Sequence, residues 1–299
     1  MHRRQFLKRG GLAVAASSLG TFGYAIGFEP HWIEVVEREL VLEALPVGLE
    51  GARLVQLSDL HVGPRVSDAY VIEAFDRARA LAPDIVAITG DFLTHRTDRG
   101  AEQFTQLGGV LAHVPRGRLA TVGILGNHDY GRNWSEPDVA ERVVAEAEQA
   151  GVRMLRNERY DVAGLDIIGV DDLWARRSDP AVALGKRQSA ATVVLVHNPD
   201  AADQATWGNY RGWMLAGHTH GGQCKAPFLP PPLLPVQNRR YVAGAVTVDA
   251  QRTLYINRGI GHLVRARFGV RPEITVFTLR SASGASGASV DTVEEAGSR

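Results

Sequence analysis

The chain has 299 residues, and 45% of them are hydrophobic, so it is long enough to bury a sizeable core as a globular protein. Its 33 basic residues balance its 33 acidic ones, which removes any argument from charge for nucleic acid as a partner. The single cysteine, Cys224, excludes an internal disulfide as a source of stability. We therefore expect a specific site, rather than overall charge, to carry the function.

The first 28 residues differ in kind from the rest. Arg3 and Arg4 precede Phe6-Leu7-Lys8, and the run from Gly11 to Phe28 carries no charge. This pattern resembles a twin-arginine export signal, and the alternative is a basic start before a buried helix. We expect export by the twin-arginine machinery to the periplasm or cell envelope. The small residues ending at Ala25 form a weak cleavage site, so residues 10–28 could instead remain as a membrane attachment.

Apolar runs of strand length alternate with segments of helical periodicity along the rest of the chain. The helices are expected at residues 67–81, with Ser67 as N-cap, and at residues 136–151. Strands are expected at residues 34–45, 53–58, 84–89, 119–125, 165–170, 191–196, 212–217, 244–249, 253–259 and 273–279. This alternation predicts an α/β domain over residues 29–280. The proline-rich segment 226–241 must be an ordered loop, and residues 281–299 a disordered tail.

Polar side chains follow five of these predicted strands. They are Asp59 and His61, then Asp91, then Asn127 with His128 and Asp129, then His197, and finally His218 and His220. In α/β folds the carboxyl ends of the strands share one edge of a sheet, so residues far apart in sequence are expected to meet there. Glycines beside Asp91, Asn127 and His218 permit the tight turns that this convergence needs.

Each of these blocks has a structural explanation when it is taken alone. Aspartates cap turns, and histidines are often hydrogen-bonded core residues. The His-x-His of residues 218–220 is by itself as common in loops as in metal sites. Five blocks at five strand ends favour a metal site, and the mixture of carboxylate, amide and imidazole ligands suits Mn, Fe or Zn better than Ca or Mg.

The five blocks, in this order, resemble the signature of the calcineurin-like metallophosphoesterases. The form of residues 217–223, the export signal and the "INRGIG" of residues 256–261 are most similar to an exported bacterial phosphodiesterase branch of that family. The resemblance implies a layered α/β/β/α sandwich with mixed sheets. A metallo-β-lactamase-type site is excluded, because it needs a contiguous H-x-H-x-D-H block and Gly221 and Gly222 follow His220 here.

The resemblance also implies a role for each residue. Two divalent metal ions would be bound, one by Asp59, His61, Asp91 and His220, and the other by Asp91, Asn127, His197 and His218. His128 would act as the catalytic histidine that donates to a phosphate oxygen or to the leaving alkoxide, and Asp129 would orient His128 or a ligand. Arg132, Arg258 and Arg265 lie near these blocks and could clamp a phosphate, although a solvated position is the simpler expectation for each.

The function implied is a dinuclear metal-dependent phosphodiesterase that acts outside the cytoplasm through a hydroxide shared by the two ions. Its substrate would be a phosphodiester, and the apolar proline-rich loop leaves room for a cell-wall or lipid-linked one. One alternative is a UDP-2,3-diacylglucosamine-type pyrophosphate hydrolase, which the expected location disfavours because such nucleotide sugars are cytoplasmic. The non-enzymatic alternative is a metal-binding interaction scaffold, which the complete set of ligands disfavours.

Overall fold

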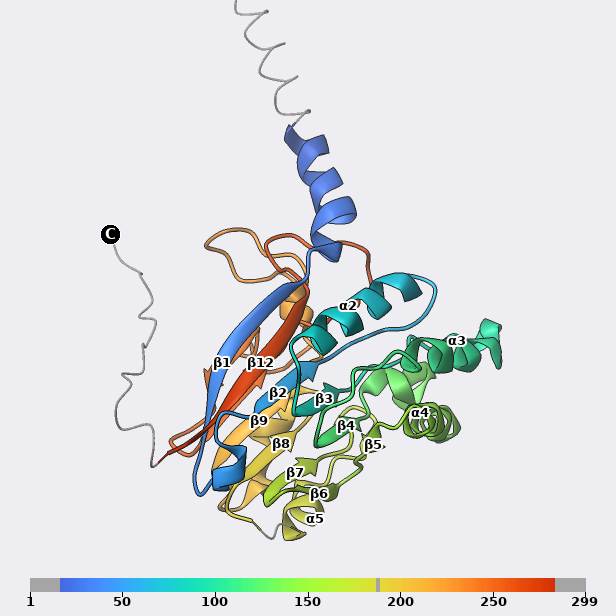
Figure 1. Cartoon of the computed structure of the whole chain (residues 1–299). Helices are drawn as coiled ribbons and strands as arrows, with labels where there is room; N and C mark the ends of the chain where they lie inside the picture. The colour runs from blue at the N-terminus through green and yellow to red at the C-terminus, as the bar shows by residue number, and fades with distance from the viewer. Residues whose placement is uncertain (1–16, 187–188, 283–299) are drawn as a thin grey trace, which may run out of the picture.

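The structure of the protein, a computed structural model, describes residues 17–186 and 189–282. Two six-stranded sheets lie against each other, with helices on their outer faces (Figure 1). Both sheets contain parallel and antiparallel neighbours. The predicted layered α/β/β/α sandwich with mixed sheets is confirmed.

The first sheet contains the strands that precede three of the predicted ligand blocks. Its strand order is β1 (Glu34–Leu42), β12 (Glu273–Ser281), β2 (Arg53–Leu57), β3 (Ile85–Thr89), β4 (Ala120–Ile124) and β5 (Arg153–Met154). Only β12 and β2 pair in antiparallel fashion. β3 and β4 are buried along their whole length, as their continuous apolar sequences predict.

The second sheet contains the strands that precede the other two blocks. Its strand order is β10 (Gly244–Thr247), β11 (Arg252–Ile256), β9 (Gly212–Ala216), β8 (Thr192–Leu195), β7 (Leu165–Gly169) and β6 (Glu158–Val162). The four inner strands run parallel, and the two edge strands are antiparallel to their neighbours. β6 was not predicted because its sequence is mostly polar and only Val162 is buried.

Helices cover the outer face of each sheet. Over the first sheet lie α2 (Asp68–Ala80), α3 (Glu102–Leu111) and α4 (Pro137–Gln149). Over the second sheet lie α5 (Pro180–Gly185) and the short 3-10 helices Pro199–Asp203 and Ala205–Trp207. The helices predicted at 67–81 and 136–151 are confirmed as α2 and α4. Ser67 occupies the N-cap position of α2, but its side chain makes no capping hydrogen bond.

Side chains of successive strand residues point into different layers of the core. Leu54 and Ile85 pack between the two sheets, whereas their neighbours Val55 and Val86 pack under the helices. This alternation explains why the strands read as uninterrupted apolar runs, since both faces are buried. The two sheets are thereby held in fixed relation, and so are the loops at their ends.

The two ends of the chain are described only in part. The twin-arginine motif of the predicted signal lies outside the described residues, and residues 17–23 form an exposed helix that continues into Tyr24–Phe28 (Figure 1). Among the described residues no helix has both the length and the apolar character needed to cross a membrane. β12 extends to Ser281, one residue past the predicted end of the domain, and residues 283–299 of the predicted tail lie outside the described residues. The segment 226–241 contains no helix or strand, as predicted.

Candidate metal centre

The five predicted blocks meet where the carboxyl ends of strands from both sheets come together. Asp59, His61, Asp91 and Asn127 come from the first sheet, and His197, His218 and His220 come from the second. The sequence predicted convergence at the edge of one sheet, and the structure corrects this, because the site lies between the edges of two. All seven side chains are buried. Buried polar groups on this scale need partners, so their arrangement has chemical meaning.

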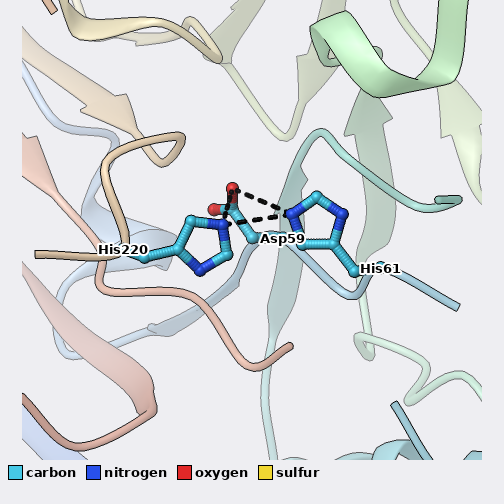
Figure 2. Close-up of side chains that lie close together, drawn as sticks. All are labelled: Asp59, His61 and His220. Atoms are coloured by element: carbon cyan, nitrogen blue, oxygen red, sulfur yellow. Dashed lines mark hydrogen bonds and ion pairs between the residues drawn. The ribbon is translucent and has the colours of Figure 1, made fainter. Parts of the chain in front are cut away.

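Asp59, His61 and His220 form a first group (Figure 2). Nε2 of His220 lies 3.1 Å from Nε2 of His61 and 3.3 Å from Oδ1 of Asp59. The two rings are stacked with their centroids 5.0 Å apart. Burial lowers the pKa of His61 to about 3 and lowers that of His220 well below its usual value, so both imidazoles are neutral. Neutral imidazole is the form that binds a metal ion.

Asp91, His197 and His218 form a second group. Nε2 of His197 lies 3.2 Å from Oδ2 of Asp91, 3.2 Å from Oδ1 of Asn127 and 3.2 Å from Nδ1 of His218. Burial lowers the pKa of His218 to about 3. Burial also lowers the pKa of His197, but the charges of Asp91 and nearby aspartates outweigh it and raise this pKa to about 10. In the metal-free chain His197 thus carries the positive charge that this acidic cluster attracts.

Asp91 lies between the two groups. Its Oδ2 is 3.2 Å from Nε2 of His197 and 3.5 Å from Nε2 of His61. Its other oxygen, Oδ1, accepts a hydrogen bond from the backbone N–H of His128. One carboxylate oxygen therefore faces a histidine from each group, which is the position a bridging ligand requires.

The outer nitrogens of the histidine rings support metal binding by the inner ones. Nδ1 of His197 donates to the carbonyl of Thr89, and Nε2 of His218 donates to the carbonyl of Pro235. Each of these bonds places a proton on the outer nitrogen, so the inner nitrogen is the one that faces the site. The inner nitrogen of His218 carries a lone pair, and that of His197 gains one when a metal ion displaces its proton. In both groups several atoms able to bind a metal ion thus face a common point, and one cation at each point would satisfy them. The donor set fits two divalent ions.

The backbone of the site is strained. Asp59, His61, Asp91, His218 and His220 all have positive φ, between 49° and 72°. Left-handed conformations of residues other than glycine cost about 1–3 kcal/mol each and persist where the surrounding structure demands them. Five of the seven predicted ligands share this conformation, so the fold sacrifices stability to aim their side chains.

Glycines allow the strand ends to approach each other. A Cβ atom on Gly90, whose φ is +91°, would lie 2.6 Å from Nδ1 of His197. A Cβ atom on Gly126 would overlap Asp91, and one on Gly217 would overlap Asp59. The prediction that these three glycines let the side chains converge is confirmed. Close approach is the reason at Gly126 and Gly217, since neither has positive φ.

His128 and Asp129 occupy different positions beside the ligands. His128 is partly exposed, and its ring lies edge-on to that of His61 with centroids 5.2 Å apart. Asp129 is buried, and it accepts hydrogen bonds from the backbone of Leu93 and Gly126. Burial raises the pKa of Asp129 well above its usual value. Asp129 therefore joins the segments that follow Asp91 and precede Asn127 by hydrogen bonds.

Residues that the sequence did not indicate surround these ligands. The ring of Trp174 packs against the rings of His218 and Trp134, with centroid distances of 4.5 Å and 4.4 Å. Arg267 is fully buried, and its Nη2 lies 3.4 Å from Nδ1 of His220. Nothing in the sequence placed Trp134, Trp174 or Arg267 at the site, because the tryptophans lie in irregular segments and Arg267 is one of many arginines outside the five blocks.

The three arginines considered as phosphate clamps have other contacts or positions. Arg258 is ion-paired with Glu273 and Glu34, so it belongs to the framework. Arg132 lies 3.8 Å from Glu136 and is largely exposed, and Arg265 is exposed. The simpler expectation of a solvated position therefore fits Arg132 and Arg265, whereas Arg258 is neither solvated nor free.

Comparison with known proteins places this geometry in context. The family model described as calcineurin-like phosphoesterase matches residues 52–222, which include every residue of the two groups. The chain is 33% identical to the uncharacterized metallophosphoesterase YkuE of Bacillus subtilis, covering 94% of this chain and 98% of that protein. It is 30% identical to the phosphodiesterase YaeI of Escherichia coli, covering 93% and 98%. It is 26% identical to the UDP-2,3-diacylglucosamine pyrophosphatase LpxG of Chlamydia trachomatis, covering 88% and 94%.

Proposed function

The chain belongs to the calcineurin-like phosphoesterase family, and from this premise we propose that it hydrolyses phosphodiesters outside the cytoplasm. The observation that carries the proposal is the pair of buried ligand groups with the Asp91 carboxylate between them. The similarity to the phosphodiesterase YaeI over nearly the whole of both chains supports a diester rather than a monoester as substrate.

Two divalent metal ions are the cofactors for which these groups are suited. Asp59, His61, Asp91 and His220 would hold one ion, and Asp91, Asn127, His197 and His218 the other. Manganese, iron and zinc all match this mixture of imidazole and oxygen ligands. When bound, such a pair supplies a nucleophile at neutral pH and neutralises the charge of the phosphoryl oxygens.

His128 is the protein group suited to proton transfer. It is the only histidine of the cluster that is partly exposed, and its backbone N–H is held by Asp91. Its ring can therefore reach a bound phosphodiester while its main chain stays fixed to the shared ligand. We assign it donation of a hydrogen bond to a phosphoryl oxygen, or of a proton to the departing alkoxide. Asp129 contributes by holding the turns of Asp91 and Asn127.

The N-terminal segment supports export by the twin-arginine route. Arg3 and Arg4 with the following Phe-Leu-Lys match the motif, and the uncharged run from Gly11 to Phe28 follows at once. We propose that the body of the protein acts in the periplasm or cell envelope, with residues 10–28 as an attachment where they are retained. Replacing both arginines by lysine should keep the protein in the cytoplasmic fraction of a host that exports the unaltered chain. Equal export of the two would refute this assignment.

The activity is tested directly with the full chain loaded with Mn²⁺. We expect hydrolysis of bis(p-nitrophenyl) phosphate, little hydrolysis of the monoester p-nitrophenyl phosphate, and two metal ions per chain by elemental analysis. A panel of cell-wall phosphodiesters, phospholipids and UDP-2,3-diacylglucosamine tests the natural substrate class.

The outcomes of this panel separate the alternatives. Preference for UDP-2,3-diacylglucosamine would favour the pyrophosphate hydrolase, in line with the similarity to LpxG. A chain that binds two ions and hydrolyses neither diesters nor pyrophosphates would be an interaction scaffold. Failure to bind metal at all would contradict the assignment of both ligand groups.

A further inference from the structure

A cluster of apolar side chains stands exposed beside the metal centre. Phe228, Leu229, Leu233 and Val264, here called the apolar rim, have 103%, 60%, 78% and 63% of their surface exposed. They lie on two loops, residues 226–241 and 257–272, at the end of the molecule from which the N-terminal helix projects (Figure 1). Grouped exposed apolar residues of this size mark interaction surfaces, unlike single ones.

The two loops are bound to each other as one surface. The side chain of Gln223 donates to the carbonyls of Val264 and Ala266 at 2.8 and 2.9 Å. Lys225 and Phe268 are joined through a backbone hydrogen bond of 2.7 Å. The loop that carries Phe228 thus begins where the loop that carries Val264 is attached, so the rim is a built feature of the fold.

The same loops are bound to the metal centre. The carbonyl of Pro235, two residues after Leu233, accepts from Nε2 of His218 at 2.9 Å. Arg267 donates to the carbonyls of Gly259 and Gly261, and the same nitrogen lies 3.4 Å from His220. The first loop is therefore connected to His218 of the second group, and the second loop to His220 of the first group. Each of the two loops that carry the rim thus contacts one histidine of the metal centre.

The first loop is held rigidly although it contains no helix or strand. The carboxylate of Asp200 accepts from the backbone of Gln237 and Asn238 at 2.7 and 3.0 Å. Arg239 reaches back to the carbonyls of Pro231 and Leu234. Residues 231–238 of this loop are thus fixed to the body of the protein, and Leu233 stands exposed among them.

The charge of the surface selects its partner. Residues 224–241 and 257–272 contain no Asp or Glu and seven Lys or Arg, but Arg267 is buried and Arg258 and Arg271 pair with glutamates of other segments. Lys225 and Arg265 are exposed, and no ion pair holds either of them within the described residues. Exposed apolar side chains with unpaired cations on the same loops match an anionic lipid bilayer, in which the apolar side chains enter the interface and the cations meet phosphate groups.

The N-terminal helix strengthens this interpretation. Ala25 accepts from the backbone of Arg267, and Glu29 accepts from the backbone of Gly269 and Val270. The base of the helix is therefore attached to the loop that carries Val264, and Leu19 and Phe22 of the helix are exposed. A chain attached to a membrane through this segment would face the bilayer with the apolar rim.

We propose that the apolar rim docks on an anionic lipid bilayer and delivers the phosphodiester of a lipid headgroup to the metal centre. The delivery step rests on the proposed function, whereas the docking step does not. Hydrolysis would add one water across one P–O bond of the headgroup and leave a phosphomonoester and an alcohol, so no other reactant is required.

The test uses the full chain and vesicles of phosphatidylcholine, with or without phosphatidylglycerol, in a co-sedimentation assay. The triple variant Phe228→Ser, Leu229→Ser, Leu233→Ser should bind phosphatidylglycerol vesicles about 10-fold or more weakly. The double variant Lys225→Gln, Arg265→Gln should lose the preference for phosphatidylglycerol. The N-terminal segment is the same in all variants, so differences report the rim.

A matched control keeps the test specific. Val47, in the short helix η3 (Val47–Leu49) at the other end of the sandwich (Figure 1), is 92% exposed, and Val47→Ser should leave vesicle binding unchanged. Equal binding by the triple variant and the unaltered chain would overturn the proposal. So would a dimer in light scattering that the triple variant dissociates, because the rim would then be an interface between copies of this chain.

Turnover separates failure of docking from failure of the proposed function. The triple variant should hydrolyse soluble bis(p-nitrophenyl) phosphate at the normal rate but release water-soluble product from phosphatidylglycerol vesicles about 10-fold or more slowly. Undiminished release from vesicles would overturn the delivery step. If the unaltered chain hydrolyses no diester but the rim still controls vesicle binding, the proposed function fails while docking stands.

Discussion

The metal centre and the apolar rim both depart from the usual pattern of a folded protein, in which apolar side chains are buried and polar ones are exposed. The metal centre buries aspartates and histidines, and the rim exposes phenylalanine, leucine and valine. Either arrangement alone costs stability, because buried polar groups lose hydration and exposed apolar ones retain it. Departures from the ordinary pattern of this kind are expected where function requires them.

The two regions differ in what defines them. The metal centre depends on single atoms, such as Oδ2 of Asp91, which faces a histidine from each group. The rim depends on the sum of several apolar surfaces, no one of which has a specific partner. Substitutions at the metal centre should therefore cause large losses from one change, whereas the rim should lose binding in increments. The following predictions test that difference.

Asp91→Asn should have the largest effect. The substitution keeps the size of the side chain and removes the negative charge that the two groups share, so both ions should bind more weakly. We expect turnover of bis(p-nitrophenyl) phosphate to fall by roughly 10³-fold, more than the 10–100-fold typical of groups that only support a ligand. Elemental analysis should find fewer than two ions. Asp249→Asn, at an exposed turn, is the control and should retain both; a fully loaded Asp91→Asn chain would refute the shared position.

His128→Ala should abolish proton donation but leave the metals in place. His128 belongs to neither ligand group, so its loss should lower turnover by about 10²-fold with the metal content unchanged. His113→Ala, at an exposed position near the end of α3, is the control and should be fully active. Loss of metal from the His128→Ala chain would instead show that this residue supports ligand geometry.

Gly90→Ala should destabilise the fold through one added carbon. The new Cβ would meet Nδ1 of His197 and the backbone of Gly126, at a φ of +91° that side chains rarely adopt. We expect a loss of about 2 kcal/mol in unfolding free energy, measured by urea denaturation of the metal-free chain. Gly109→Ala in α3 is the control, since no atom lies within 4 Å of its added carbon, and it should be neutral or slightly stabilising. Equal stability of the two variants would contradict close packing at the metal centre.

Most of the metal centre could be predicted from the sequence because its chemistry is local. Each ligand follows a strand whose apolar run is unbroken, and each glycine stands beside the ligand that it accommodates. His218 and His220 belong to different groups, although both have left-handed φ and so do not alternate as residues of an extended segment would. The strand pattern by itself predicted one shared sheet edge, and only the family resemblance implied two sheets, because strand order depends on contacts between residues far apart in the sequence.

The rim and the surroundings of the ligands could not be predicted, for a related reason. The proline-rich segment was correctly expected to be an ordered loop, but its path depends on how Asp200 and Arg239 bond to residues 231–238 within it. Gly221 and Gly222, which follow His220, allow close packing between loops, because added carbons would meet Val270 and Pro231. α3 and α5 were missed because the first contains two glycines and the second is six residues long.

Trp174→Ala should have the smallest effect, because Trp174 acts on a ligand through packing alone. Its ring lies edge-on to His218 and beside Trp134, and aromatic contacts of this kind contribute about 0.5–1.5 kcal/mol. Since the Pro235 carbonyl still fixes the tautomer of His218, we expect Mn²⁺ affinity in the second group to fall only about 2- to 10-fold. Calorimetric titration of Trp174→Ala with Mn²⁺ should still find two binding sites, and only the site in the second group should be weaker. Trp32→Ala is the control and should bind both ions as the unaltered chain does. If the second ion were lost altogether, aromatic packing rather than the hydrogen bond to Pro235 would be what holds His218 in place. The metal centre would then depend on apolar surface, as the rim does.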